Sequence, residues 1–219
     1  MRTRFAEVRE RVDEAAAAAG RSGADVEILV ATKYLGVEGL QVLADAGVRL
    51  VGESRAQDLV AKHERYGDTF TWDFIGHLQS RKTKQVLPLV RLIHGVDSMS
   101  VVQEVQRLSA NTTRVLLEVN IGEEETKSGV APDRVDAFLE EAATYDRVEF
   151  VGLMCMPPLG VSAPSSAPYF ARTRELAARL STAWRGRYTF AGLSMGTSAD
   201  YDVAVSEGAT IVRVGSVLF

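Results

Sequence analysis

The chain has few of the residues that build disulfide frameworks and metal sites. Its 219 residues include one cysteine, Cys155, and three histidines. A single cysteine cannot form an intrachain disulfide, and the scattered histidines do not have the spacing of a zinc site. The sequence therefore excludes an internal disulfide and contains no metal-ligand motif.

Long apolar runs and concentrated positive charge are also missing. No run approaches the ~20 apolar residues that a membrane-spanning helix needs, and residues 1–7 begin a charged amphipathic segment rather than a signal peptide. Lysine and arginine are not gathered in one segment, and the formal net charge is −4, so we expect no nucleic-acid-binding face. These absences predict a cytoplasmic protein with neither a nucleic-acid nor a membrane partner.

Short apolar runs alternate with amphipathic segments along the whole chain. Val135, Phe138, Leu139 and Ala142, for example, have the spacing of a helix that buries one face. The apolar runs rich in β-branched residues predict strands at 26–32, 49–51, 71–75, 91–95, 114–120, 149–153, 187–193 and 210–214.

Eight strands that alternate with helices predict an α/β fold, a (β/α)8 or TIM barrel, with an extra N-terminal helix before the first strand. We expect one domain over residues 1–219, although about 250 residues are typical of this fold. An open doubly wound sheet is the alternative, but no Gly-x-Gly-x-x-Gly turn follows the first strand. The segment 157–168, rich in proline and serine, is predicted to be a loop at the rim.

Lys33 follows the apolar run 28–32. A lysine at the end of a buried strand would have a lowered pKa, because burial disfavours the ammonium form. The neutral amine is a nucleophile toward carbonyls and the usual anchor of pyridoxal phosphate. Taken alone, the position is also that of an ordinary solvated strand end.

Two later segments have the composition of a phosphate site. Gly196, Thr197 and Ser198 supply a small turn, hydroxyl groups and backbone N–H donors, and Gly215 and Ser216 supply a second such turn. Barrels commonly bind phosphate between the loops that follow strands seven and eight. A serine helix cap and a turn glycine would explain the same residues without a ligand.

Arg213 lies within the eighth predicted strand, on the face opposite Val212 and Val214. A guanidinium inside a barrel needs acceptors. The pyridine nitrogen of a cofactor would be one such acceptor, and a carboxylate on a neighbouring strand would serve equally well.

Motifs over most of the chain carry a family resemblance. They are VATK (30–33), VGES (51–54), WDFIGHLQSRK (72–82), IHGVDS (93–98), LLEVNIGEEETKSGV (116–130), GLM (152–154) and LSMGTSADYDVAVSEGATIVRVGSVLF (193–219). With these motifs the chain resembles the pyridoxal phosphate homeostasis proteins, single-domain relatives of the N-terminal barrel of alanine racemase. The resemblance implies an alanine racemase N-terminal domain-like barrel that holds pyridoxal 5'-phosphate (PLP) as an internal aldimine.

The resemblance also implies the residues of a cofactor site. The Schiff-base lysine of the family falls on Lys33, and its arginine beside the pyridine nitrogen falls on Arg213. Its phosphate-binding positions and the adjoining glycine fall on Ser194, Gly196, Ser198, Gly215 and Ser216. Its positions around the ring fall on Ile75, His77 and Met195.

The chain departs from the family pattern at several positions. The family usually has serine, asparagine, histidine, asparagine and methionine where this chain has Thr32, Ser54, Asp73, Arg81 and Thr197. None of these changes removes a predicted anchor of the cofactor.

The resemblance and the residues together predict what the site does. An arginine at the pyridine nitrogen disfavours protonation of that nitrogen and makes the cofactor a poorer electron sink. Racemisation needs a second acid or base on the opposite face, which alanine racemase takes from a C-terminal domain that we expect this chain to lack.

We therefore expect a monomeric PLP-binding protein of vitamin B6 homeostasis, without substantial turnover, that has apo PLP-dependent enzymes as recipients. A low-activity PLP-dependent amino-acid racemase is the alternative. A barrel that binds some other phosphorylated ligand without covalent attachment is a third possibility.

Overall fold

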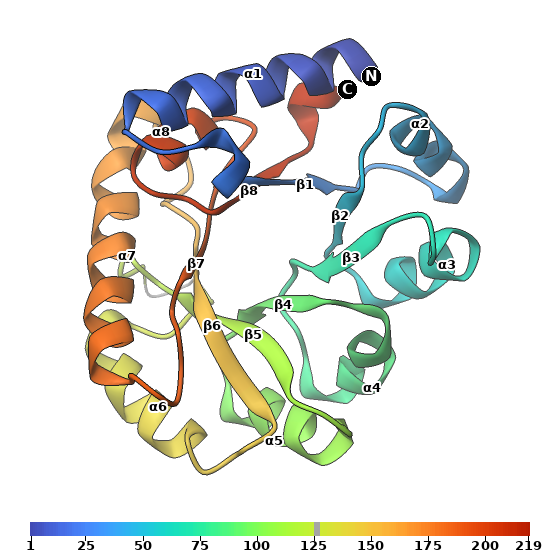
Figure 1. Ribbon diagram of the computed structural model, residues 1–219. Helices are drawn as coiled ribbons and strands as arrows, with labels where there is room; N and C mark the ends of the chain where they lie inside the picture. Colours follow the sequence, from blue (N-terminus) through green and yellow to red (C-terminus); the bar gives the residue numbers. More distant parts are fainter. Residues whose placement is uncertain (125–127) are drawn as a thin grey trace.

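The computed structural model describes residues 1–124 and 128–219, so part of the motif 116–130 lies outside the described residues. Eight parallel strands close into a barrel in sequence order, with β8 paired to β1 (Figure 1). The strands are β1 Glu27–Ala31, β2 Leu50–Glu53, β3 Thr71–Phe74, β4 Leu92–Val96, β5 Thr113–Val119, β6 Val148–Cys155, β7 Gly192–Thr197 and β8 Ile211–Val214. The predicted TIM barrel is confirmed.

Helices surround the strands on the outside of the barrel (Figure 1). They are α1 Arg2–Ala18, α2 Leu40–Asp45, α3 Ala56–Tyr66, α4 Thr83–Val86, α5 Met99–Leu108, α6 Val135–Ala142, α7 Ala163–Ala183 and α8 Tyr201–Ser206. The predicted extra helix is α1, which packs against α8 and buries Val8, Val12 and Ala16. No helix of the described residues is long and apolar enough to cross a membrane.

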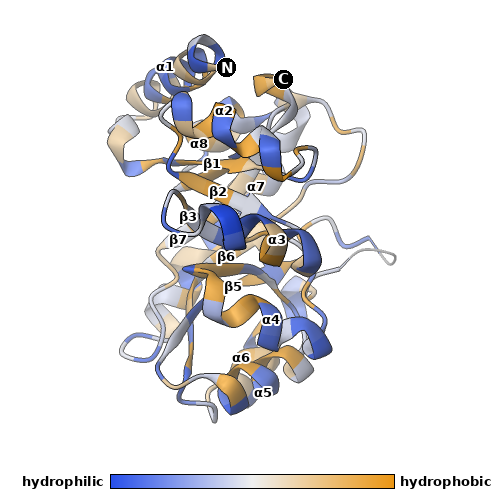
Figure 2. Cartoon of the chain, turned by 90° about the vertical axis from the view of Figure 1, so that its right-hand side faces the viewer, coloured by the Kyte–Doolittle hydropathy of each residue, from blue (hydrophilic) through white to orange (hydrophobic). Residues whose placement is uncertain are grey.

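The apolar side chains form two layers, because strand residues point alternately to the helices and to the barrel interior. The larger layer lies between strands and helices, and Figure 2 shows the apolar colours along the strands. The inner layer is small and consists of Leu29, Leu92, Leu116, Val151, Met154 and Ile211, with Leu50 and Ile75 packed against it. The barrel also buries polar residues, among them Asp73, His94, Ser194 and Arg213.

The seventh strand begins later than predicted, at Gly192 instead of residue 187. Tyr188 and Phe190 alternate with polar residues as in a strand, but their rings pack edge to face with centroids 5.9 Å apart. Phe190 also has a φ of 50°, which interrupts an extended backbone. The segment 194–197 therefore belongs to the strand rather than to the loop after it.

The predicted rim loop 157–168 is also too long, because α7 already begins at Ala163. Pro164 occupies the first turn of this helix, where a backbone N–H would have no helical partner. Pro168 lies inside the helix as well. The proline-rich composition therefore marked a loop over 157–162 but not over 163–168.

Candidate functional site

A cavity of about 380 Å³ opens where the strands end. The residues that line it come from the ends of β1, β7 and β8 and from the loops after β1, β2, β3, β6, β7 and β8, since the carboxyl ends of parallel strands meet at one face of a barrel. They are Ala31, Lys33, Tyr34, Ser54, Ile75, Met156, Thr197, Ser198, Ala199, Arg213, Gly215 and Ser216. Six of the ten predicted site residues are among them: Lys33, Ile75, Ser198, Arg213, Gly215 and Ser216.

Lys33 lies at the mouth of this cavity, two residues beyond the end of β1, and is exposed. Its Nζ lies 4.9 Å from the centroid of the Tyr34 ring, and Tyr34 is itself 71% exposed. Of the two predictions for this position, the buried lysine is therefore wrong, and the solvated strand end is the one observed. The amine is instead accessible to a molecule that enters the cavity.

Arg213 is buried at the base of the cavity, where its hydrogen bonds go to uncharged acceptors. Its Nη1 donates to the carbonyl and the hydroxyl oxygen of Ser194, the first at 2.7 Å. Its Nη2 donates to the carbonyl of Cys155 at 3.0 Å and lies 2.9 Å from the Met156 sulfur. Burial lowers the pKa of the Arg213 guanidinium, which nevertheless stays charged at working pH. A buried cation whose direct hydrogen-bond partners are uncharged faces this cavity, with the carboxylates of Glu118 and Asp200 acting on it from farther away.

Ser198 connects the loop after β7 to the loop after β8. Its Oγ accepts hydrogen bonds from the backbone N–H groups of Gly215 and Val217, at 2.9 and 3.3 Å. The neighbouring Asp200 accepts from the backbone and the hydroxyl of Thr197, at 2.7 and 3.1 Å. The two N–H groups that now bond to Ser198 are donors that an anion in the cavity could use.

The other four predicted residues do not line the cavity. Met195 is fully buried in the layer between the strands and the helices. Ser194 is fully buried behind Arg213. Gly196 has a φ of 87° and brings the β7 backbone against Ala204 and Tyr201. His77 is half-exposed, and its Nδ1 lies 3.6 Å from an Asp97 carboxylate oxygen.

Sequence reasoning missed a buried polar chain behind Arg213. His94 Nδ1 lies 2.9 Å from the hydroxyl oxygen of Ser194, and His94 Nε2 lies 3.1 Å from an oxygen of Asp73. All three residues are fully buried. The available signal was the period of two in β3 and β4, which places Asp73 and His94 on the interior face.

A second polar cluster consists of His77, Asp97 and Glu118, with one potential ligand atom from each within 4.8 Å of the others. Glu118 accepts from the Ser128 hydroxyl at 2.6 Å, and Asp97 accepts from the Gly129 N–H at 3.0 Å. Burial raises the pKa of Glu118, and the Asp97 carboxylate acts in the same direction. One imidazole and two carboxylates could ligate a divalent cation, but hydrogen bonds already hold one oxygen of each carboxylate.

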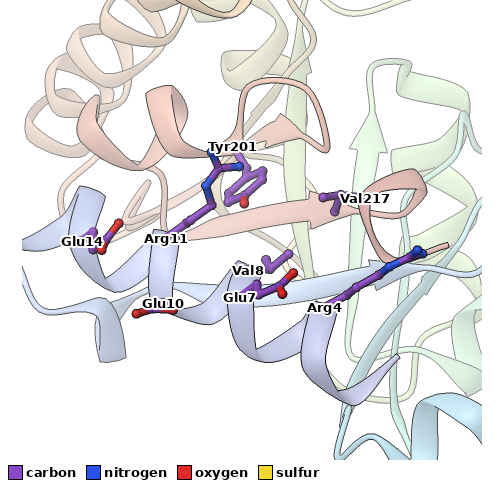
Figure 3. A pocket seen from close by; sticks show the side chains of 8 residues that line it. All are labelled: Arg4, Glu7, Val8, Glu10, Arg11, Glu14, Tyr201 and Val217. Atoms are coloured by element: carbon purple, nitrogen blue, oxygen red, sulfur yellow. The ribbon is translucent and has the colours of Figure 1, made fainter.

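A hollow of about 400 Å³ lies elsewhere, between α1 and α8 (Figure 3). Exposed side chains of both charges line it along α1, together with Val8, Tyr201 and Val217. It has no amine or thiol nucleophile and no buried cation. The chemistry-bearing residues therefore meet in the cavity at the strand ends.

The chain is similar to known proteins over nearly its whole length. Residues 5–219 match the family model described as "Alanine racemase, N-terminal domain". The chain is 36% identical over 220 residues to a pyridoxal phosphate homeostasis protein of Aquifex aeolicus, covering 99% of this chain and 96% of that protein.

Two solved structures are also similar in both sequence and fold. One is an unknown protein from Bifidobacterium adolescentis, with a TM-score of 0.90, 31% identity, and coverage of 100% of this chain and 94% of that one. The other is PipY of Synechococcus elongatus with PLP bound, with a TM-score of 0.83, 30% identity, and coverage of 97% and 99%.

Proposed function

Since the chain belongs to the family of alanine racemase N-terminal domains, we propose that it binds PLP in the cavity at the strand ends and serves PLP homeostasis. The observation that carries this proposal is the meeting of Lys33, Arg213 and the loops of Ser198 and Gly215 around one cavity. The names of the similar proteins, a pyridoxal phosphate homeostasis protein and PipY with PLP bound, support the same function.

The residues present fit the three chemical parts of PLP. Lys33 Nζ, at the mouth, would attack the aldehyde carbon, so that a C=N bond forms and water leaves. Hydroxyls of Ser198 and Ser216 and the N–H groups of Gly215 and Val217 would hold the phosphate. Ile75 would pack on the ring, and Arg213 would donate to the ring nitrogen. PLP itself supplies an electrophilic aldehyde and an electron sink.

We propose that the site holds the cofactor and passes it to apo-enzymes, with little turnover of its own. Arg213 can donate to the ring nitrogen but does not readily protonate it, which weakens the electron sink. Among the described residues that line the cavity, Tyr34 is the one phenol, and its ring centroid lies 4.9 Å from Lys33 Nζ. The described lining therefore offers no phenol apart from this neighbour of Lys33 as the second base that a two-base racemisation needs. We propose that the protein works as a monomer.

Borohydride reduction followed by mass spectrometry tests the attachment. PLP-loaded protein should gain the mass of the reduced cofactor on the peptide that contains Lys33. Lys33→Ala should lose this mass, and Lys84→Ala, at an exposed lysine of α4, should keep it. An unchanged adduct in Lys33→Ala would defeat the assignment.

Two further measurements separate the alternatives. Interconversion of D- and L-amino acids at about 1 per second or faster would favour a racemase over a carrier. Loss of phosphate-ligand affinity in Ser198→Ala, with no effect of Lys33→Ala, would favour a barrel that binds a phosphorylated ligand without a covalent link.

A further inference from the structure

Arg213 is the first member of a hydrogen-bonded chain that crosses the barrel interior. Ser194 on β7 bonds to Arg213, His94 on β4 bonds to Ser194, and Asp73 on β3 bonds to His94. Ser194, His94 and Asp73 are completely buried, and Arg213 is 7% exposed. A connection between strands on different sides of the barrel therefore runs from the cavity into the core.

This series of hydrogen bonds continues to the opposite end of the barrel. Arg91, which immediately precedes β4, donates to both oxygens of Asp73 from Nε and Nη2, at 3.0 and 2.7 Å. The same guanidinium donates to both oxygens of Glu27, the first residue of β1, at 2.6 and 3.0 Å. The side chains of Arg91 and Glu27 are 30% and 45% exposed. The Asp73 carboxylate is thus anchored by a cation that reaches solvent.

The chemistry of the side chains decides which partner donates in each of these hydrogen bonds. An arginine can only donate, so the Ser194 oxygen is the acceptor of its bond with Arg213. An ionised carboxylate can only accept, so His94 Nε2 carries a proton and donates it to Asp73. In the neutral imidazole Nδ1 then carries no proton and accepts from the Ser194 hydroxyl.

The surroundings of His94 support this neutral tautomer. Burial lowers the pKa of His94, and the charges of Arg213 and Arg91 act in the same direction, against the Asp73 carboxylate. A second proton on the imidazole would present a donor to Ser194. The hydroxyl would then accept from two sides, and its own hydrogen would be left without its partner.

We propose that Asp73, acting through His94 and Ser194, positions Arg213 for its contact with the ring nitrogen of PLP. This inference rests on the proposed function, in which Arg213 makes that contact. Asp73, His94 and Ser194 are positioning residues, and none of them lines the cavity. Without the Asp73 carboxylate, nothing selects the Nε2–H tautomer, so Ser194 no longer has one fixed orientation under the guanidinium.

Asp73→Asn tests the inference, with Glu27→Gln as the matched control. The first change removes the carboxylate at His94, while the second removes only the outer, partly exposed carboxylate and keeps an acceptor for Arg91. In Asp73→Asn we expect PLP affinity to fall about tenfold and the absorption bands of the bound cofactor to change in ratio at a fixed pH. In Glu27→Gln we expect both to stay as in the unsubstituted protein.

The tautomer is measured separately in the cofactor-free protein. ¹⁵N NMR should show His94 as the Nε2–H form in the unsubstituted chain and in Glu27→Gln, and as a mixture or the Nδ1–H form in Asp73→Asn. An imidazolium or Nδ1–H form in the unsubstituted chain would overturn the inference. If Asp73→Asn does not fold, Ser194→Ala breaks the next link, and an unchanged cofactor spectrum in that variant would overturn it equally.

The same experiments separate this inference from the function on which it rests. If the unsubstituted protein forms no adduct at Lys33, both fail. If it forms the adduct, and folded Asp73→Asn has the normal spectrum and the normal His94 tautomer, PLP binding stands and only the inference that Asp73 positions Arg213 fails.

Discussion

Lys62 on α3 forms an ion pair with Glu53 at the end of β2, in which the two side chains are 4% and 0% exposed. Lys62 Nζ also donates to the carbonyl of Thr32 at 2.9 Å, and the Thr32 hydroxyl donates to Glu53 at 2.9 Å. The buried lysine of this site region is therefore Lys62. It fixes the backbone immediately before Lys33 to a neighbouring strand and helix.

Lys62→Met should destabilise the fold by about 3–5 kcal/mol, because it leaves the Glu53 carboxylate buried without a cation. Urea unfolding measures the change. Lys62→Met combined with Glu53→Leu should recover much of the loss, since neither charge is then left alone. A loss below about 1 kcal/mol in the single variant would show that the pair behaves as a solvent-exposed one.

Glu118 should make the stability of the protein depend on pH. Its pKa in the folded state lies above its ordinary value of 4.5, because burial and Asp97 disfavour the carboxylate. The folded state therefore binds this proton more tightly than the unfolded state, and the Glu118 contribution to stability falls as pH rises above about 4.5 through the raised pKa.

Glu118→Gln removes this dependence and keeps an oxygen that can accept from Ser128. We expect the variant to be more stable than the unsubstituted protein at pH 8 by about 1 kcal/mol, and equally stable at pH 4, where the carboxyl is protonated in both states. Thermal unfolding at the two pH values measures the difference. A variant that is less stable at pH 8 would mean that the Glu118 charge is compensated.

Cys155 should not react with thiol reagents in the native protein. It is fully buried, and burial raises its pKa to about 11, so that roughly one thiol in a thousand is ionised at pH 8. A chromogenic disulfide reagent should label it only in denaturant. Rapid labelling under native conditions would show that β6 opens far more readily than its burial indicates.

The barrel could be predicted because strands and helices differ locally in the spacing of their apolar residues, which recur with a period of two in strands and of 3.6 in helices. The sequence also predicted which loops meet, since parallel strands bring their carboxyl ends to one face. Lys33 lines the predicted cavity, and only its predicted burial was wrong, because β1 ends two residues before it and strand ends are the least certain part of such a prediction.

The position of the Met195 side chain and the buried hydrogen bonds of Ser194, His94 and Asp73 were not predicted, for two other physical reasons. The seventh strand was predicted to end at residue 193, which left Met195 in a loop, whereas its place in β7 turns its side chain toward the helices. The contact of His94 with Ser194 joins residues 100 positions apart. No local pattern contains it, because it depends on closure of the barrel.

Gly196→Ala should destabilise the protein and weaken PLP binding together. The φ of 87° disfavours any L side chain, and an added Cβ would lie 2.5 Å from the Ala204 Cβ and 3.0 Å from the Tyr201 Cα. Gly20→Ala is the control, because Gly20 has a φ of 71° but open space around it. Strain alone costs about 1 kcal/mol at Gly20, and the contacts with α8 should raise the cost at Gly196 to about 3 kcal/mol. Urea unfolding and PLP titration measure both effects; equal losses in the two variants would mean that α8 moves aside without cost.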